Sequence, residues 1–261
     1  MPYSVYKAER VGIEPKGMRW GLWPFYFEQY VSDQEPDMSL SDPEGQAQAR
    51  LVMWLRPTRT DRPSGWLHMG WRYTRIETYS DITNSQYWKS WSKTTRQARK
   101  RWLNDVAGKT HIVRIATYEE YERGYTESVV AKRTKGDSIY MARQLEQYTP
   151  DTMTYWIAEC MEDKTIKAGI AITSSPSTSN AYYAAAYLHQ DSGDYPLMIG
   201  LFDEWYKTAT AQGYKYLHLG EIWTPGKPKS WKGFSVFKLK FGVICIAYRP
   251  VLVRFVWGRL F

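Results

Sequence analysis

Three short strand-like segments follow one another in the second half of the chain: TYWIAEC (Thr154–Cys160), AGIAITS (Ala168–Ser174) and AYYAAAYL (Ala181–Leu188). Runs of this length, rich in aromatic, β-branched and small residues and bounded by polar residues, are typical of buried strands. The polar turn Glu162–Lys164 between the first two predicts a hairpin. Together the three segments predict the centre of an antiparallel sheet.

Strand and helix patterns precede this sheet. His111–Ala116 is strand-like, and Thr117 with Glu120 forms a capping box that predicts a helix continuing to about Arg133. A second helix, capped by Asp137, is expected to end before the next proline.

A helix and a strand follow the sheet. Asp194 and Pro196 predict a helix start, Gly213 predicts its end, and Tyr214–Leu219 is the next strand; the helix carries an apolar stripe of Met198, Leu201, Trp205 and Ala209. This order of elements resembles the GNAT (acyl-CoA N-acyltransferase) fold, an α+β fold with a mixed, mostly antiparallel sheet flanked by helices. The resemblance implies a sheet that splays where an activated acyl donor enters.

The first third of the chain reads as strands and loops. Leu51–Leu55 and Gly65–Glu77 predict strands, and the polar stretch Ser32–Gly45 predicts a surface loop. We therefore expect three parts: a reduced, β-rich N-terminal GNAT-like half (1–84), a basic linking helix (85–105) and a GNAT-like transferase domain (106–261).

The linking segment Ser85–Asn104 carries an apolar stripe at helical spacing, formed by Trp88, Trp91, Thr95, Ala98 and Trp102. A second row is basic, with Lys89, Lys93, Arg96, Arg99, Lys100 and Arg101. A solvated linker helix and a polyanion contact both explain this pattern. In the second case the nucleic-acid-binding candidates are Lys93, Arg96, Arg99 and Lys100.

The composition limits the classes of function. The 261 residues carry a formal net charge of +8, which favours polyanions such as nucleic acid, phosphorylated substrates or an anionic membrane surface. The two cysteines form no C-x-x-C pair and the four histidines are scattered, so no metal site is predicted. Arginines and a proline interrupt the apolar segment Val243–Phe261, and we expect a terminal strand there rather than an interfacial membrane segment. The expected location is cytoplasmic, with peripheral contact at the inner membrane face as an alternative.

The segment Glu221–Gly242 (EIWTPGKPKSWKGFSVFKLKFG) holds the most specific motif. Gly233-Phe234, Phe237-Lys238 and Phe241-Gly242 resemble the G-(L/F/V)-x-x-F-K-x-x-F-G signature of the FemX/FemAB family. Arg75-Ile76-Glu77 is similar to the family's R-(I/L)-(E/D)-P, although Thr78 replaces the proline.

The resemblance implies an aminoacyltransferase that moves an amino acid from aminoacyl-tRNA to an amine of a peptidoglycan-type precursor or another small acceptor. An ester is already activated, so catalysis needs positioning and a cation for the oxyanion, and the resemblance assigns that cation to Lys238. Position alone makes Glu221 the candidate proton acceptor, with loop capping as its alternative role. The substrate-binding candidates are Arg75, Lys229, Trp231, Lys232, Gly233, Phe234 and Phe237.

Several alternatives remain at this stage. Lys238 could be a strand-edge surface lysine, and Trp231 could stack on a base or merely pin its loop. The donor could be an acyl-CoA or an acyl-carrier protein, although the loop His189–Pro196 has a single glycine and two carboxylates and is a poor phosphate cradle. A non-catalytic basic module that binds RNA or anionic lipid is the third possibility. The acyl donor is a co-substrate in either enzymatic case, and we expect no cofactor.

Overall fold

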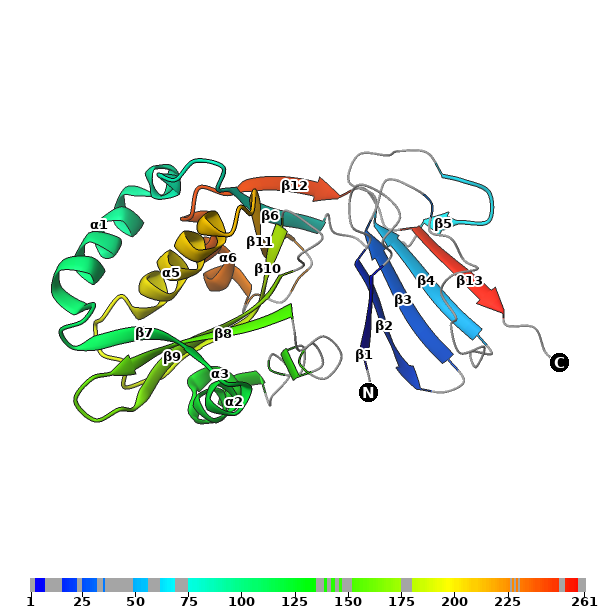
Figure 1. Ribbon diagram of the computed structural model, residues 1–261. Coiled ribbons are helices and arrows are strands. Elements are labelled where there is room, and N and C mark those ends of the chain that lie inside the picture. Colours follow the sequence, from blue (N-terminus) through cyan, green and yellow to red (C-terminus); the bar gives the residue numbers. More distant parts are fainter. Residues whose placement is uncertain are drawn as a thin grey trace. The chain divides into compact units, whose positions relative to one another are not determined.

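The computed structural model describes residues 3–7, 16–22, 25–31, 35, 49–55, 62–68, 75–134, 139, 142–143, 146, 152–174, 180–225, 227, 229, 231–248 and 252–257. The chain forms two compact units (Figure 1). The small unit comprises residues 1–77, 221–232 and 245–261, and the large unit comprises residues 78–220 and 233–244. The boundaries expected at residues 84 and 105 do not coincide with this division, because the basic segment belongs to the large unit and the C-terminal strand to the small one.

A seven-stranded sheet has the order β12-β6-β11-β10-β9-β8-β7. Its strands are β6 (Arg75–Asp81), β7 (His111–Ala116), β8 (Met153–Cys160), β9 (Ile166–Ser174), β10 (Asn180–Leu188), β11 (Tyr216–Glu221) and β12 (Ile244–Tyr248). Strands β7 to β10 pair antiparallel in sequence order, and β10 pairs parallel with β11. The predicted hairpin and the mixed, mostly antiparallel sheet are confirmed.

Helices cover both faces of this sheet. Helix α5 (Leu197–Ala211) lies over one face, and α2 (Tyr118–Glu127) with α3 (Val129–Thr134) lies over the other (Figure 1). The predicted stripe of α5 forms part of the main core, since Leu201, Trp205 and Ala209 are buried. On the opposite face, tyrosines of α2 pack against Tyr155 and Tyr187 of the sheet. The sheet thus packs against helices through two apolar layers, one on each face, as expected for an α+β fold.

The basic segment is broken rather than one continuous helix. It consists of a 3-10 turn (Tyr87–Ser90), α1 (Lys93–Arg101) and a π-helical turn (Trp102–Val106). Trp91 is extended, and the Ser92 side chain accepts a hydrogen bond from the Thr95 amide as the N-cap of α1. Serine competes with the helix for its own backbone, so it favours the cap over the interior. The apolar stripe survives the break, because Trp91, Thr95 and Trp102 are all buried.

The capping box of Thr117 and Glu120 is present, but its helix is shorter than expected. Helix α2 ends at Glu127, the backbone of the next residue, Ser128, is extended, and α3 follows at once. The side chain of Ser128 accepts a hydrogen bond from the Ala131 amide, so this serine starts the new helix. The helix expected after Asp137 lies largely outside the described residues.

The small unit contains a six-stranded sheet of order β1-β2-β3-β4-β13-β5. Its strands are β1 (Tyr3–Lys7), β2 (Lys16–Leu22), β3 (Phe25–Val31), β4 (Ala49–Leu55), β5 (Leu67–His68) and β13 (Leu252–Trp257). The strand expected at 51–55 is confirmed, whereas the strand expected at 65–77 is divided between β5 and β6, which belong to different sheets. The expected loop Ser32–Gly45 lies outside the described residues apart from Glu35.

The apolar C-terminal segment forms strands, as predicted. Strand β13 pairs antiparallel with β4 over six residues, and Leu252 is fully buried beside Trp54 and Trp66. Burial of these side chains accounts for the high apolar content of the segment. No helix in the described part of the chain is long and apolar enough to cross a membrane.

Candidate functional site

The large sheet splays between β10 and β11. Their parallel pairing covers three residue pairs, and the last of these joins Tyr182 to His218. Strand β10 continues to Leu188, but its register against β9 shifts between Tyr183 and Ala185, which marks a bulge. Bulges bend a strand and re-aim its side chains. The bulge therefore lies directly beyond the point where the pairing of the two strands ends.

Lys238 reaches this splay from helix α6 (Trp231–Leu239). The residue is only 3% exposed, and its Nζ lies 4.0 Å from the ring centroid of Phe234 and 5.5 Å from that of Tyr183. A Cβ on Gly220 of β11 would lie 3.2 Å from this Nζ. The ammonium is therefore held by aromatic faces of α6 and β10 next to the backbone of β11, a geometry that stabilises a desolvated cation.

The alternative of a strand-edge surface lysine is wrong, because Lys238 is helical and buried. Phe234, Phe237 and Phe241 recur at a spacing of three and four residues, which is a helical pattern that the preceding Lys-, Gly- and Pro-rich stretch obscures. Phe237 lies 5.3 Å from Phe202 of α5 and 5.0 Å from Phe241, measured between ring centroids. Its ring is therefore part of the packing that orients α6, although it was predicted to bind substrate.

Gly220 leaves room for the side chain of Lys238, because it has no Cβ. Its φ of +80° lies in the region that L-residues with a side chain rarely adopt, and its carbonyl accepts a 2.7 Å hydrogen bond from the Thr78 hydroxyl of β6. A side chain at this position would strain the backbone and displace the ammonium. Sequence reasoning missed this glycine, because only its distance from Lys238 gives it a role.

The loop 221–232 of the small unit closes around a different lysine. Lys227 is buried, and its Nζ donates hydrogen bonds to a carboxylate oxygen of Glu221 and, over 2.9 Å, to the carbonyl of Ile222. The indole of Trp223 donates a 3.0 Å hydrogen bond to the carbonyl of Lys227. These bonds hold Lys227 inside the loop, where its ammonium pairs with a carboxylate of the protein itself. Glu221 stays a predicted proton acceptor, with Lys227 as its counterion.

The other predicted substrate-binding residues of this segment lie at its surface. Trp231 is 40% exposed, with the Nζ of Lys227 5.3 Å from its ring centroid. The Nζ of Lys232 lies 4.4 Å from the ring of Trp223. Lys229 and Gly233 are exposed. Arg75 begins β6, and its side chain is outside the described part of the structure.

Helix α1 presents three of its four predicted nucleic-acid contacts to solvent. Lys93, Arg96 and Lys100 are exposed, whereas the Nε of Arg99 donates a 2.6 Å hydrogen bond to the buried carboxylate of Asp203 in α5. Arg99 is therefore committed to holding α1 on the core, and it is the weakest of the four candidates. Burial, with the same carboxylate beside it, raises the pKa of Tyr87, whose hydroxyl donates to Asp203.

The start of α1 is attached to the end of α6. The amide of Ser92 donates a 2.8 Å hydrogen bond to the carbonyl of Lys240, and a Cβ on Gly242 would clash with the Ser90 carbonyl oxygen, well inside van der Waals distance. Only glycine allows this approach at position 242, where φ is +63°. The basic helix and the helix of Lys238 are thus one connected assembly within the large unit.

The loop between β10 and α5 uses its acidic residues internally. Asp191 accepts a 2.8 Å hydrogen bond from the ammonium of Lys167, which lowers the pKa of the carboxyl, and His189 Nε2 lies 2.6 Å from the carbonyl oxygen of Gly124. Helix α5 begins at Leu197, and the residue before it, Pro196, provides no side-chain cap. No group of three His, Cys, Asp or Glu side chains that could hold a metal occurs among the described residues.

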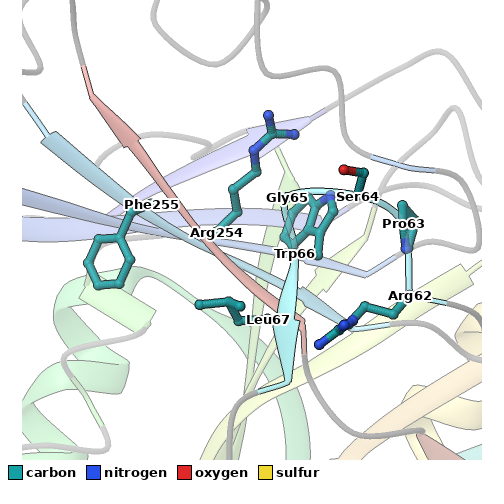
Figure 2. A pocket seen from close by; sticks show the side chains of 8 residues that line it. All are labelled: Arg62, Pro63, Ser64, Gly65, Trp66, Leu67, Arg254 and Phe255. Atoms are coloured by element: carbon teal, nitrogen blue, oxygen red, sulfur yellow. The ribbon is translucent and has the colours of Figure 1, made fainter.

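A pocket of about 460 Å³ lies in the small unit (Figure 2). The guanidinium of Arg254 lies against the turn at Gly65. The Glu35 carboxylate accepts a 2.7 Å hydrogen bond from the Trp66 indole and forms an ion pair with Arg254 at 3.6 Å. None of the predicted site residues lines it; the lining consists of Arg62, Pro63, Ser64, Gly65, Trp66, Leu67, Arg254 and Phe255. These contacts explain how the turn is held.

Comparisons with known proteins place the fold. No family model and no curated protein matches the sequence. The solved structure of FemX matches with a TM-score of 0.68 and 10% identity over 98% of this chain and 89% of FemX. The C-terminal domain of a putative lysylphosphatidylglycerol synthetase from Agrobacterium fabrum matches with a TM-score of 0.56 and 13% identity, over 97% of this chain and 84% of that one.

A tandem GNAT protein from the clavulanic acid biosynthesis pathway matches with a TM-score of 0.51 and 9% identity, over 100% of this chain and 86% of that one. Identities this low concern the fold alone. In its fold this chain resembles FemX, and its architecture is the α+β GNAT-like fold that the order of its strands and helices predicts.

Proposed function

We propose that this protein is an aminoacyltransferase that moves an amino acid from aminoacyl-tRNA to an amine of a peptidoglycan-type precursor or another small acceptor. The observation that carries the proposal is the buried ammonium of Lys238 at the splay of β10 and β11. The GNAT-like fold supports acyl transfer in general, since the sequence resemblance implies that an activated donor enters at this splay.

The chemistry requires little beyond positioning and one cation. The attacking amine adds to the ester carbonyl, and negative charge develops on the carbonyl oxygen. An ammonium held by aromatic faces and shielded from water stabilises that oxygen more than a solvated lysine would, because it is already oriented and its field is weakly screened. Loss of a single such donor typically costs about 100- to 1,000-fold in kcat.

The basic helix supports a tRNA donor over a small thioester. Lys93, Arg96 and Lys100 are exposed on α1, whose first turn is bonded to the end of α6. A row of solvent-exposed cations binds phosphates with a strong salt dependence. The tRNA body would contact this row while its acylated 3′ end reaches Lys238. A cytoplasmic location belongs to the same proposal, because the donor is cytoplasmic; peripheral membrane contact stays a prediction.

A donor assay tests this proposal. The full-length protein is incubated with total tRNA charged with labelled amino acids and with a lysine-containing muramyl-pentapeptide precursor, and the label in the precursor is measured. We expect transfer that depends on the charged tRNA and is lost in Lys238→Met. Transfer from acyl-CoA but not from charged tRNA would mean that the donor is an acyl-CoA and not an aminoacyl-tRNA. Salt-sensitive tRNA binding without turnover from either donor would indicate a non-catalytic binding module, and it would overturn the proposal.

A further inference from the structure

Three aromatic rings contact one another across neighbouring strands of the large sheet. The imidazole of His218 in β11 lies 4.5 Å from the ring of Tyr79 in β6, at an interplanar angle of 29°. The ring of Tyr182 in β10 lies 5.3 Å from the imidazole, edge to face. All three side chains are half-buried.

The imidazole occupies a particular place in the sheet. His218 and Tyr182 form the last residue pair before β10 and β11 separate. Gly220 follows two residues later, which is about 7 Å along a strand, and it is the residue against which the Lys238 ammonium lies. A reacting carbonyl at the splay could thus contact the ammonium on one side and a nucleophile bound to the imidazole on the other.

We propose that His218 is the proton acceptor for the attacking amine, an inference that rests on the proposed function. The neutral amine nitrogen bonds to the carbonyl carbon, and its extra proton passes to a ring nitrogen of His218. As the bond between the carbonyl carbon and the 3′-ribose oxygen breaks, the imidazolium returns this proton to the ribose oxygen. Atoms and charges balance without a further reactant, and the imidazole is regenerated.

The surroundings suit an imidazole that gains and loses a proton. A ring that stacks on Tyr79 keeps its orientation in both charge states, and histidine changes charge between about pH 5 and 8. The titratable groups near it include the phenols of Tyr79 from β6 and Tyr182 from β10 and, beyond Gly220, the ammonium of Lys238 from α6. Phenols and ammonium groups ordinarily titrate near pH 10, so these three groups would not give a transition below pH 8.

The test is the pH dependence of transfer, measured in single turnover with the charged tRNA and muramyl-pentapeptide that the wild-type protein uses. We expect the wild-type rate to rise with pH through a transition between about pH 5 and 8. In His218→Phe, which keeps a ring on Tyr79, we expect about a 100-fold lower rate at pH 7 and loss of that transition. Tyr79→Phe, which keeps the stack, should retain it.

Chemical rescue separates catalysis from folding. In His218→Ala, added imidazoles should restore transfer in proportion to their basicity, with tRNA binding and the melting temperature as controls for the folded state. A wild-type protein that transfers, combined with a His218→Phe variant that keeps the same pH transition, would overturn this inference alone. Rescue that does not depend on basicity would also overturn it. A wild-type protein that transfers nothing would instead remove the proposed function.

Discussion

Two lysines eleven residues apart have opposite environments. Lys227 is buried with its ammonium bonded to the Glu221 carboxylate and the Ile222 carbonyl. Lys238 is buried with its ammonium against the rings of Phe234 and Tyr183, beside a glycine with no side chain. A carboxylate fixes the first cation in place as part of a loop. Ring faces lie against the second, and a cation–π contact stabilises a cation in such a place.

The comparison shows that a count of basic residues does not identify an anion site. The lysines at 227, 229, 232, 238 and 240 look equivalent in the sequence. In the structure, Lys227 is buried inside its loop and Lys238 is buried at the splay of the sheet. The other three lysines are exposed. The contacts of each ammonium, rather than its presence, distinguish the structural role of Lys227 from the catalytic role that we propose for Lys238.

The largest expected effect comes from exchanging each buried lysine for methionine. Lys238→Met should lower kcat by about 100- to 1,000-fold, because the thioether still packs on the rings of Phe234 and Tyr183 but supplies no charge. Lys227→Met should instead lower the free energy of unfolding by about 2 kcal/mol, since it leaves the Glu221 carboxylate without its counterion. Transfer kinetics and urea unfolding measure the two effects. The comparison fails if both variants lose stability equally and neither loses kcat selectively.

The exposed cations of α1 form a third class. Replacing Lys93, Arg96 and Lys100 with Glu should weaken tRNA binding about 30-fold at 0.1 M salt. The slope of log K against log salt concentration should fall by the equivalent of about two to three phosphate contacts. The matched control reverses three exposed lysines elsewhere, Lys109, Lys164 and Lys207, with the same change in net charge. Equal loss of affinity in both triple variants would mean that net charge, not α1, attracts the tRNA. Filter binding across a salt series distinguishes the two results.

The space beside Lys238 can be filled directly. Gly220→Ala places a Cβ 3.2 Å from the ammonium in a backbone with φ of +80°, and we expect about a 10-fold lower kcat with about 1–2 kcal/mol less stability. Gly213→Ala is the matched control, because its φ is +79° and no described atom lies within 4 Å of the new Cβ. Equal kcat values in the two variants, at equal stability, would show that the ammonium tolerates displacement.

The smallest effect concerns Arg114, a cation that again pairs with carboxylates. Its guanidinium bonds Glu120 and Glu159, and this contact, with the Thr117 amide, lowers the pKa of Glu120 to about 2. A lowered pKa stabilises the folded state above the ordinary carboxyl value, so this contribution should disappear as the pH falls from about 5 towards 2. Glu120→Gln should remove about 1 kcal/mol at pH 7, reduced by solvent screening, and flatten acid unfolding in that range. An unchanged acid transition would contradict the assignment.

Local patterns account for what the sequence could predict. Strands β8 to β10, the hairpin at Glu162–Lys164 and the capping box at Thr117 depend on residues close in the chain. The break at Ser92 and the division of 65–77 between two sheets were missed, because capping competes with helix propagation and sheet membership depends on distant partners. Helix α6 was missed because its start lies in a stretch rich in Lys, Gly and Pro.

The candidate site was predictable only at its motif. Lys238 was found because it stands within a family-like signature, whereas Tyr183, Gly220 and His218 acquire their roles from contacts between elements far apart in the sequence. The burial of Lys227 depends on the whole loop folding around Glu221. Spacing identifies a reactive residue type, but packing decides which copy of it faces a substrate.

A crystal structure with an aminoacyl-adenosine analogue tests the central claim most directly, with a tetrahedral phosphonate in place of the ester carbonyl. If the buried ammonium at the splay stabilises the oxyanion, a phosphonate oxygen will lie about 3 Å from Lys238 Nζ, between the separated strands β10 and β11. A phosphonate bound elsewhere, with that Nζ still enclosed by Phe234 and Tyr183, would contradict the assignment of Lys238 as the catalytic cation.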